Sequence, residues 1–198
     1  MGYDCLMVDH DSFQDRGRAL EEEYFRKKNR ELVEKMQREA ADERARKALQ
    51  DSTGLTDPEA LRELQALGFT PDTVKLLPLV PVIRVAWAEG GVTLVERQAI
   101  VKLARTRGIP EGSPADRQLS EWLAKCPEEH VFTRATRLIG ALLDSPAHSQ
   151  VGVTADALVK DCEQIASASG GIFGLRSISD DERALLNTIA DTLKKRKG

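Results

Sequence analysis

Hydrophobic and charged residues are unevenly distributed along this chain. Between Asp15 and Leu49, twenty of thirty-five residues are charged, whereas almost every residue from Leu76 to Ala88 is apolar. The pattern predicts a long charged helix over residues 15–50 and a compact domain over residues 57–198 that holds the hydrophobic core. We expect a linker at residues 51–56, where turn-forming residues gather, and a flexible N-terminus at residues 1–14.

The charged segment favours one continuous helix. It contains no proline, Gly17 is its one glycine, and most of its residues are strong helix formers. Opposite charges recur four residues apart in the favourable order, and each such pair adds about 0.2–0.5 kcal/mol. The helix can therefore form with little packing. The pairs are Glu22–Arg26, Glu23–Lys27, Glu31–Lys35, Glu34–Arg38, Asp42–Arg46 and Glu43–Lys47.

The apolar stripe on this helix is expected to be thin. Leu20, Tyr24, Leu32 and Met36 recur at multiples of four, and Lys28 interrupts them. Such a stripe is too narrow to seat the helix in a globular core and too irregular for a sustained heptad seam.

Tyr24 and Phe25 form the one adjacent aromatic pair in the chain. An aromatic pair on a charged helix can anchor the docking of a partner. The alternative is that this pair packs on the protein's own C-terminal domain, and the sequence leaves both interpretations open.

The second part of the chain predicts a bundle of helices without strands, so the fold class is all-α. Proline and glycine place the breaks between the helices. Pro58 begins one helix and Gly68 ends it, while Pro78 and Pro81 predict a bend before a helix that starts near Val82. Further helices are expected near residues 114–125, 129–143, 154–168 and 180–195.

A similar turn occurs twice in this domain, about 80 residues apart. The first copy runs AWAEGGVTLVER from Ala86, and the second runs ASASGGI and then, after an insertion, ISDDER. In each copy a helix ends at two glycines, an aliphatic residue follows, and a capping box starts the next helix. The two boxes are Thr93 with Glu96 and Ser179 with Glu182, which suggests two equivalent helix–turn–helix units.

Acidic residues gather at the two turns and suggest one candidate metal site. If the bundle brings the turns together, their oxygens suit a hard divalent cation, although each acid also has a simpler role at a helix N-terminus. The residues are Glu89, Glu96, Asp180, Asp181 and Glu182. We expect no other cofactor.

The remaining chemistry argues against an enzyme. His10, His130 and His148 are scattered, and no phosphate-binding loop or catalytic motif occurs. Three cysteines lie far apart, without the spacing of a zinc site or a disulfide framework.

The net charge of −3 does not favour binding to nucleic acid. A signal peptide and a membrane span are both missing from the pattern, so we expect no membrane insertion and a cytoplasmic location.

The repeated turn, within AWAEGGVTLVERQAI and SISDDERALLNTIADTL, resembles the TerB-like family of tellurite-resistance helical domains. The resemblance covers about residues 76–195. It implies a compact α-bundle that serves as an interaction or stress-response module, with no established catalysis. Glu89 stands where this family often has aspartate, and Ser169 also departs from the family pattern.

The charged helix resembles a different family. The pattern from Phe13 to Glu31 is similar to the inhibitory segment of the ATP synthase inhibitor proteins, in which this segment inserts as a helix into the catalytic head. The resemblance implies that Phe13, Tyr24 and Phe25 are apolar anchors. It also implies ion pairs with the partner from Arg16, Glu21, Arg26 and Glu31. Gly17 stands where the mitochondrial members have an acidic residue.

These patterns predict a non-enzymatic regulatory protein. Its N-terminal helix would dock into a groove of a protein partner, for which the ATP synthase catalytic head is the candidate, and its TerB-like domain would anchor or sense. The alternative function is a stress-response adaptor or a weak divalent-metal-binding module.

Overall fold

The computed structural model describes residues 8–144, 154–169 and 180–194. All regular elements within these ranges are helical, which confirms the all-α prediction. The fold divides into two compact units, Met1–Arg44 and Ala45–Gly198. The elements are α1 (Val8–Thr53), α2 (Pro58–Ala66), the 3₁₀ helix η1 (Val74–Leu79), α3 (Val80–Ala86), α4 (Leu94–Thr106), α5 (Pro114–Ala124), α6 (Glu129–Asp144), α8 (Ala155–Ser169) and α9 (Asp180–Lys194).

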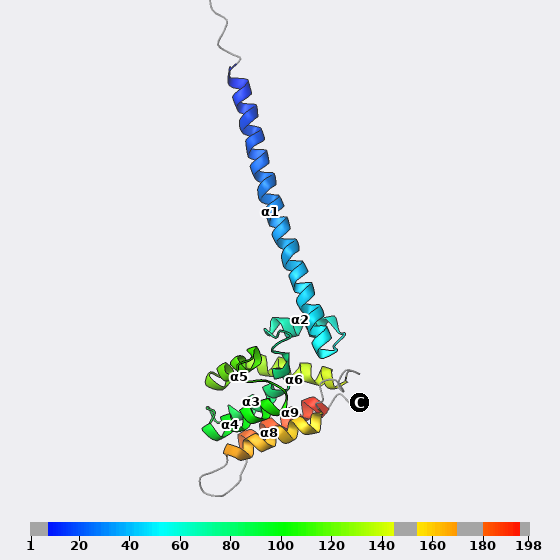
Figure 1. Ribbon diagram of the computed structural model, residues 1–198, viewed down its shortest axis with the longest axis vertical. Helices are drawn as coiled ribbons and strands as arrows, with labels where there is room; N and C mark the ends of the chain where they lie inside the picture. Colours follow the sequence, from blue (N-terminus) through cyan, green and yellow to red (C-terminus); the bar gives the residue numbers. More distant parts are fainter. Residues whose placement is uncertain (1–7, 145–153, 170–179, 195–198) are drawn as a thin grey trace, which may run out of the picture. The chain divides into compact units, whose positions relative to one another are not determined.

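Helix α1 is continuous over 46 residues and extends beyond the predicted range at both ends (Figure 1). It begins at Val8, so residues 8–14, which we expected to be flexible, are helical. Gly17 lies within the helix and does not interrupt it. At 1.5 Å per residue, the helix is about 70 Å long.

The predicted linker at residues 51–56 is too long, because residues 51–53 are helical and only residues 54–56 of it lie between helices. Helix α1 continues to Thr53, and Gly54 ends it with a positive φ of 69°. Leu49, Thr53 and Leu55 are all buried, and the Thr53 hydroxyl donates to the carbonyl of Leu49 and accepts from the amide of Leu55. The last turns of α1 and the residues after them therefore belong to the second unit. Polar turn formers suggested a linker, but the buried leucines on either side decide the structure.

Proline and capping residues set the helix boundaries at the start of the bundle. The carboxylate of Asp57 accepts from the amide of Glu59, and Pro58 opens α2, as predicted. Pro78 lies inside η1, and Pro81 lies in the first turn of α3. Because proline needs no amide partner in a first turn, α3 begins at Val80 rather than at the predicted Val82.

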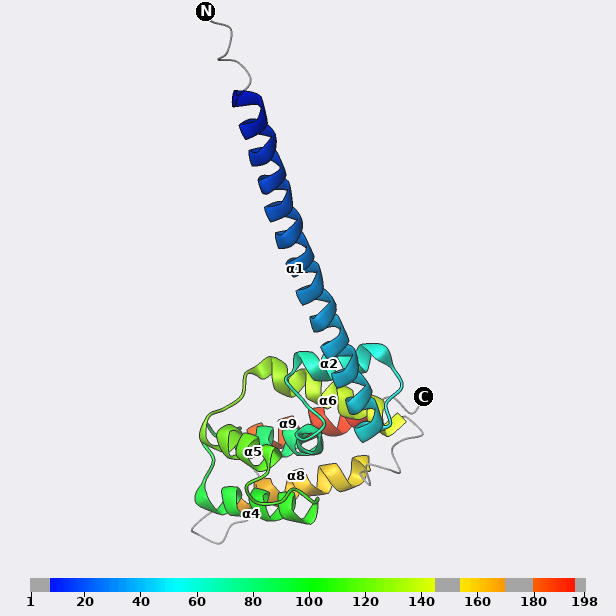
Figure 2. The ribbon, with the colours of Figure 1, turned by 45° about the horizontal axis from the view of Figure 1, so that its top comes forward.

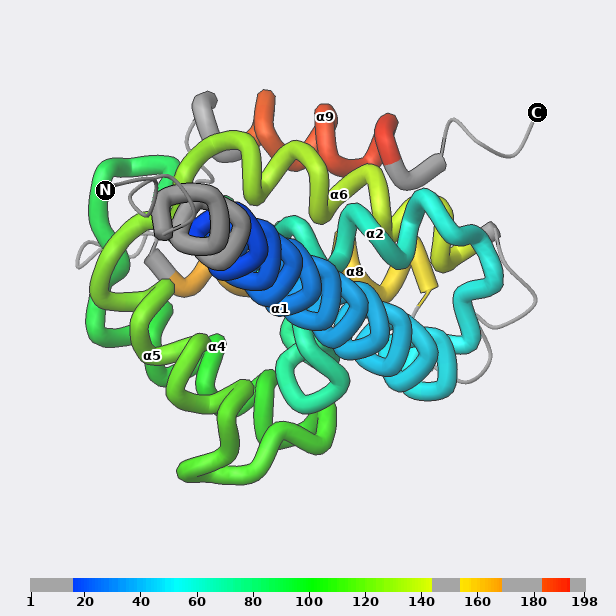
Figure 3. Tube along the Cα trace, turned by 90° about the horizontal axis from the view of Figure 1, so that it is seen from above, coloured from blue at the N-terminus to red at the C-terminus, as the bar shows by residue number. Residues whose placement is uncertain are grey.

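Helix α3 forms the centre of the second unit. Six of its seven residues are buried, and it contacts α4, α6, α8 and α9 (α3 is labelled in Figure 1, and the four helices around it are labelled in Figure 2). Helices α6 and α9 lie side by side, as Figure 3 shows. An almost wholly apolar helix of this kind is stable only when neighbours cover it on every side, which accounts for its central place.

Ion pairs connect helices around this core. Glu63 of α2 accepts from both Arg134 and Arg137 of α6, at 2.8 and 3.0 Å. Arg107, which follows α4, pairs with Asp161 of α8. These contacts link segments that are far apart in the sequence and fix how the helices pair.

The burial of Leu49 gives a direct test of the corrected boundary. We expect Leu49→Ala to lower the free energy of unfolding of the second unit by about 2–5 kcal/mol, since Leu49 is only 1% exposed. Denaturant unfolding measures this change. Leu20→Ala on the same helix is the control, since Leu20 is 67% exposed and its replacement should change stability by less than about 0.5 kcal/mol. Equal effects of the two variants would contradict the assignment.

Candidate functional site

The aromatic pair of α1 is exposed. Tyr24 and Phe25 are 58% and 60% exposed, and their rings meet edge to face with centroids 5.8 Å apart. The ammonium group of Lys28 lies 5.9 Å from the centroid of the Tyr24 ring and 3.7 Å from a carboxylate oxygen of Glu31. An aromatic surface framed by charges is therefore presented by the first unit.

The other predicted partner-binding residues also lie on α1. Arg16, Glu21, Arg26 and Glu31 are exposed. The Nε of Arg26 donates to the backbone carbonyl of Glu22 at 3.3 Å. The side chain of Phe13 lies outside the described residues, so its predicted anchoring role stays a prediction.

The ion pairs on α1 differ in part from those expected. Glu31 contacts Lys28, and Lys35 contacts Glu39 at 3.8 Å, so the predicted Glu31–Lys35 pair is not formed. All four side chains are more than half exposed. Pairs of this kind add only a few tenths of a kcal/mol each, so they support the helix without defining a site.

The apolar side chains of α1 form two faces rather than the one thin stripe predicted. Residues four apart drift by about 40° around a helix of 3.6 residues per turn, so a stripe at multiples of four winds around it. Leu20 and Tyr24 lie on one side. The second face spans about 100° of the helix surface. It comprises Phe25, Leu32, Val33, Met36 and Ala40, all of which are exposed.

The sequence pattern places Phe25 and Val33 next to the stripe, but the prediction did not group them with Leu32, Met36 and Ala40 into one face. The signal was present in the spacing, since seven, eight, eleven and fifteen residues separate Phe25 from Leu32, Val33, Met36 and Ala40. Those intervals are close to whole numbers of helical turns. Both faces lie within the unit Met1–Arg44.

The first copy of the repeated turn has the predicted geometry. Gly90 has a φ of 85°, and Val92 packs against the core. The Thr93 hydroxyl accepts from the amide of Glu96, and the Glu96 carboxylate accepts from the amide of Thr93 at 2.7 Å. The capping box at the start of α4 is thus confirmed. Residues 170–179, which hold the glycine pair and the cap of the second copy, lie outside the described residues.

This geometry commits Glu96, one of the five candidate metal ligands, to the capping box. The Glu96 side chain is only 3% exposed, and its Oε2 already accepts from both the amide and the hydroxyl of Thr93. Glu89 is exposed at the turn. The side chains of Asp180, Asp181 and Glu182 lie outside the described part of the chain. Among the side chains that the structure describes, no three of His, Cys, Asp or Glu gather as metal ligands.

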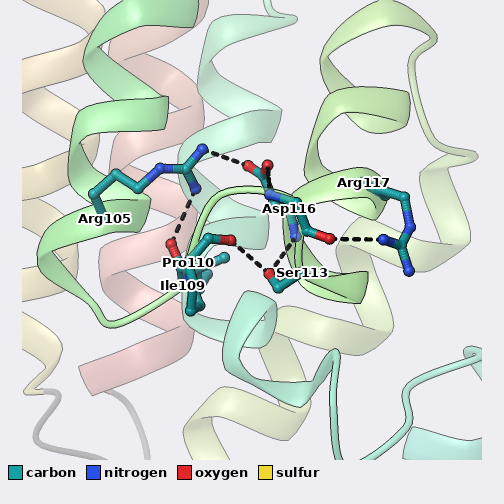
Figure 4. Close-up of polar contacts among 7 residues, drawn as sticks. Arg105, Ile109, Pro110, Ser113, Asp116 and Arg117 are labelled. Atoms are coloured by element: carbon teal, nitrogen blue, oxygen red, sulfur yellow. Dashed lines mark hydrogen bonds and ion pairs between the residues drawn. The ribbon is translucent and has the colours of Figure 1, made fainter.

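A cluster of polar contacts closes the loop between α4 and α5 (Figure 4). Arg105 donates to the Ile109 carbonyl at 3.0 Å and to the Asp116 carboxylate at 2.7 Å. The second carboxylate oxygen of Asp116 accepts from the Gly112 amide at 2.8 Å. These donors hold the pKa of Asp116 below its usual value, the Gly112 amide first and Arg105 next. All groups are satisfied within the loop, so the cluster is structural.

The two cysteines that the structure describes are not poised for chemistry. Cys162 is buried in α8, and its burial raises the pKa of the thiol to about 12. Cys126 is exposed, and desolvation together with Glu129 raises its pKa as well. Because the thiolate is the nucleophile and the metal ligand, neither thiol suits those roles at neutral pH.

Comparisons with known proteins identify no relative. No family model, no curated protein and no solved structure matches this chain. The resemblances to TerB-like domains and to ATP synthase inhibitor proteins therefore stay predictions. Among the helices described, none is long and apolar enough to cross a membrane.

The Asp116 cluster predicts a pH-dependent contribution to stability. A carboxylate with a lowered pKa stabilises the fold above its unfolded pKa, and this contribution is lost as the pH falls through the folded pKa. We expect Asp116→Asn to destabilise the second unit by about 1–2 kcal/mol at pH 7, and the difference from wild type to shrink below about pH 4. Urea unfolding from pH 7 to pH 3 measures it, with the exposed Asp72→Asn as control. A pH-independent difference would contradict this account.

The capping box predicts a second, separate effect. Glu96→Ala should lower stability by about 1–2 kcal/mol in a buffer without divalent cations, because it removes the acceptor of the Thr93 amide. Glu89→Ala, at the same turn but exposed, should change stability by less than about 0.5 kcal/mol. Thermal unfolding with EDTA and then with calcium measures both. A calcium-dependent stabilisation lost in both variants would instead restore the metal site.

Proposed function

We propose that this protein is a non-enzymatic interaction protein that binds a protein partner through the part of α1 that belongs to the first unit. The exposed apolar side chains of this unit carry the proposal. Each of these side chains is more than half exposed, and burial of apolar surface is worth about 25 cal/mol per Å². They are Leu20, Tyr24, Phe25, Leu32, Val33 and Met36.

The geometry of α1 suits docking as a helix in a groove. In that mode an amphipathic helix places anchors spaced by whole turns into an apolar groove, and aromatic anchors supply much of the binding energy. Leu20 and Tyr24 lie one turn apart on the same face. The rings of Tyr24 and Phe25 contact each other, which reduces the entropy lost on binding.

The charges on α1 favour a protein partner over nucleic acid. Residues 15–49 carry eleven basic and nine acidic side chains, so the helix is nearly neutral. Nucleic-acid binding requires clustered basic residues that displace counterions from phosphates. Mixed charges around apolar anchors instead provide register and specificity against a mixed protein surface.

The ATP synthase catalytic head is the specific partner that we propose. The resemblance of residues 13–31 to the inhibitory segment of the inhibitor proteins supports it, as does the exposure of Tyr24 and Phe25. Arg16, Glu21 and Arg26 are exposed on the same unit, where ion pairs with the head are sterically open. The second unit would anchor or sense, in the manner that the TerB-like resemblance implies.

The metal-binding alternative has less support. Glu96 is buried in its capping box, so Glu89 is the one acid at the first turn that is exposed to solvent. Hard divalent cations need several oxygen ligands, which one exposed carboxylate does not provide. The role of a stress-response adaptor is compatible with the proposed docking of α1 on a protein.

Inhibition of ATP hydrolysis tests the specific partner. We expect the full-length chain to inhibit hydrolysis by the catalytic head from the same organism at micromolar concentration. Tyr24→Ala should raise the half-inhibitory concentration about tenfold or more, because it removes an aromatic anchor.

The control is Leu94→Ala, which truncates an exposed apolar residue of the second unit and should leave inhibition unchanged. If about 10 μM protein leaves the rate of hydrolysis unaltered, the ATP synthase head is excluded as the partner. Binding with a micromolar dissociation constant would inhibit hydrolysis at that concentration. Equal losses in the two variants would contradict docking through α1.

A further inference from the structure

The second apolar face of α1 contains a short heptad seam. With Asn29 placed at position a, Met36 is the next a residue, and Phe25 and Leu32 occupy the d positions. All four side chains are exposed in the structure. Three of these four positions are apolar, and the fourth is the one polar residue type best known to specify register inside a two-stranded coiled coil.

From this seam we propose that α1 pairs with α1 of a second copy of the chain in a parallel, in-register arrangement over residues 25–36. This goes beyond the proposed function, because it assigns a second partner, another copy of the chain, to a face that shares Phe25, Leu32 and Met36 with the proposed partner-binding surface. In this pairing Phe25 meets Phe25, Leu32 meets Leu32, and Met36 meets Met36. The Asn29 amides face each other and can hydrogen-bond across the interface, which fixes the register.

The charges beside the seam select the parallel orientation. In a parallel pair, position g contacts position e of the next heptad on the other helix. Glu21 would then face Arg26 of the second copy, which is attractive. Lys28 would face Val33, and the aliphatic stem of a lysine covers such a residue well. No like charges face each other at these positions.

The antiparallel orientation brings like charges together. If Phe25 lay opposite Met36 of the second copy, the g positions would face each other. Lys28 would then face Lys35, and Glu21 would face Asp42. Like charges in direct opposition destabilise a helix pair, so charge complementarity favours the parallel form.

The ends of the seam limit its strength. Glu22 and Glu39 occupy the next core positions on either side of the seam. In a parallel pair each of them would face the same glutamate of the second copy. The seam is therefore confined to about three turns and buries less than the area of a standard stable interface. This predicts weak self-association that depends on protein concentration.

Sedimentation velocity on the full-length chain, from about 1 to 500 μM, tests the pairing by mass action. We expect a monomer–dimer equilibrium that Leu32→Glu weakens at least about hundredfold, because it places like charges in the seam. Asn29→Leu should tighten self-association about tenfold, because it replaces the polar layer with an apolar one. A tighter but still discrete monomer–dimer equilibrium distinguishes this gain from the aggregation of a misfolded chain.

Leu20→Glu is the matched control, since Leu20 is at least as exposed as Leu32 but lies outside the seam. It should leave the dimer unchanged. A monomer at every concentration, or equal effects of Leu20→Glu and Leu32→Glu, would overturn the proposal.

Oxidative cross-linking tests the orientation. The variant Met36→Cys, in a background without the native cysteines, should form a disulfide dimer, because two a positions face each other in a parallel pair. In the antiparallel pair the two residues 36 would lie about 16 Å apart along the axis, beyond the reach of a disulfide. Leu20→Cys should not cross-link. A failure of Met36→Cys to cross-link while the wild-type chain dimerises would overturn the parallel arrangement.

The two proposals fail separately. Tyr24 lies outside the seam, so Tyr24→Ala should weaken inhibition of the ATPase and leave self-association intact. A dimer without ATPase inhibition would exclude the proposed partner and keep the seam. Inhibition by a chain that is monomeric at all concentrations would do the reverse.

Discussion

The burial of Leu49 in the core of the second unit is the contact on which the structure of α1 depends. A helix gains little from exposed ion pairs, and most of its stability normally comes from packing. Here the packing is confined to the C-terminal turns, where Leu49 and Thr53 are buried. Once those turns are fixed, each further residue adds a backbone hydrogen bond without the cost of a new nucleus. The helix can thus continue back to Val8, and its side chains from Arg16 to Ala45 are exposed.

The two units differ in whether their apolar side chains are buried. The second unit holds an apolar central helix, α3, which α4, α6, α8 and α9 cover. Its polar clusters at Asp116, Glu96 and Glu63 are satisfied by their own neighbours. The first unit has the opposite character, because its large apolar side chains have no such cover. The first unit therefore leaves large apolar side chains exposed to solvent.

Sequence alone predicted most of the fold, because strong local signals mark it. Pro58, Gly68 and the Thr93–Glu96 capping box lie where the pattern placed them. The start of the linker was misplaced, because the polar residues at 51–53 do not show that Leu49 and Leu55 are buried in the hydrophobic core. Burial is a tertiary property, and it overrode the local turn signal.

The candidate site was predictable only in part, for two physical reasons. The sequence left open whether Tyr24 and Phe25 are exposed or pack on the C-terminal domain, and the structure shows both side chains exposed. The prediction placed Phe25 beside a stripe of four-residue spacing rather than on a face of its own. Four-residue spacing drifts around a helix, whereas the spacing of Phe25, Leu32 and Met36 keeps to one side. The acidic residue Glu96 could not be distinguished from a metal ligand by sequence, since a capping box and an oxygen ligand use the same carboxylate.

Amide hydrogen exchange as a function of protein concentration tests most directly that α1 is a binding helix. The account predicts that protection over residues 25–36 rises as the concentration of the chain is raised, while protection of α3 stays constant, since only the seam gains a partner. Protection over residues 25–36 that is the same at all concentrations would contradict it.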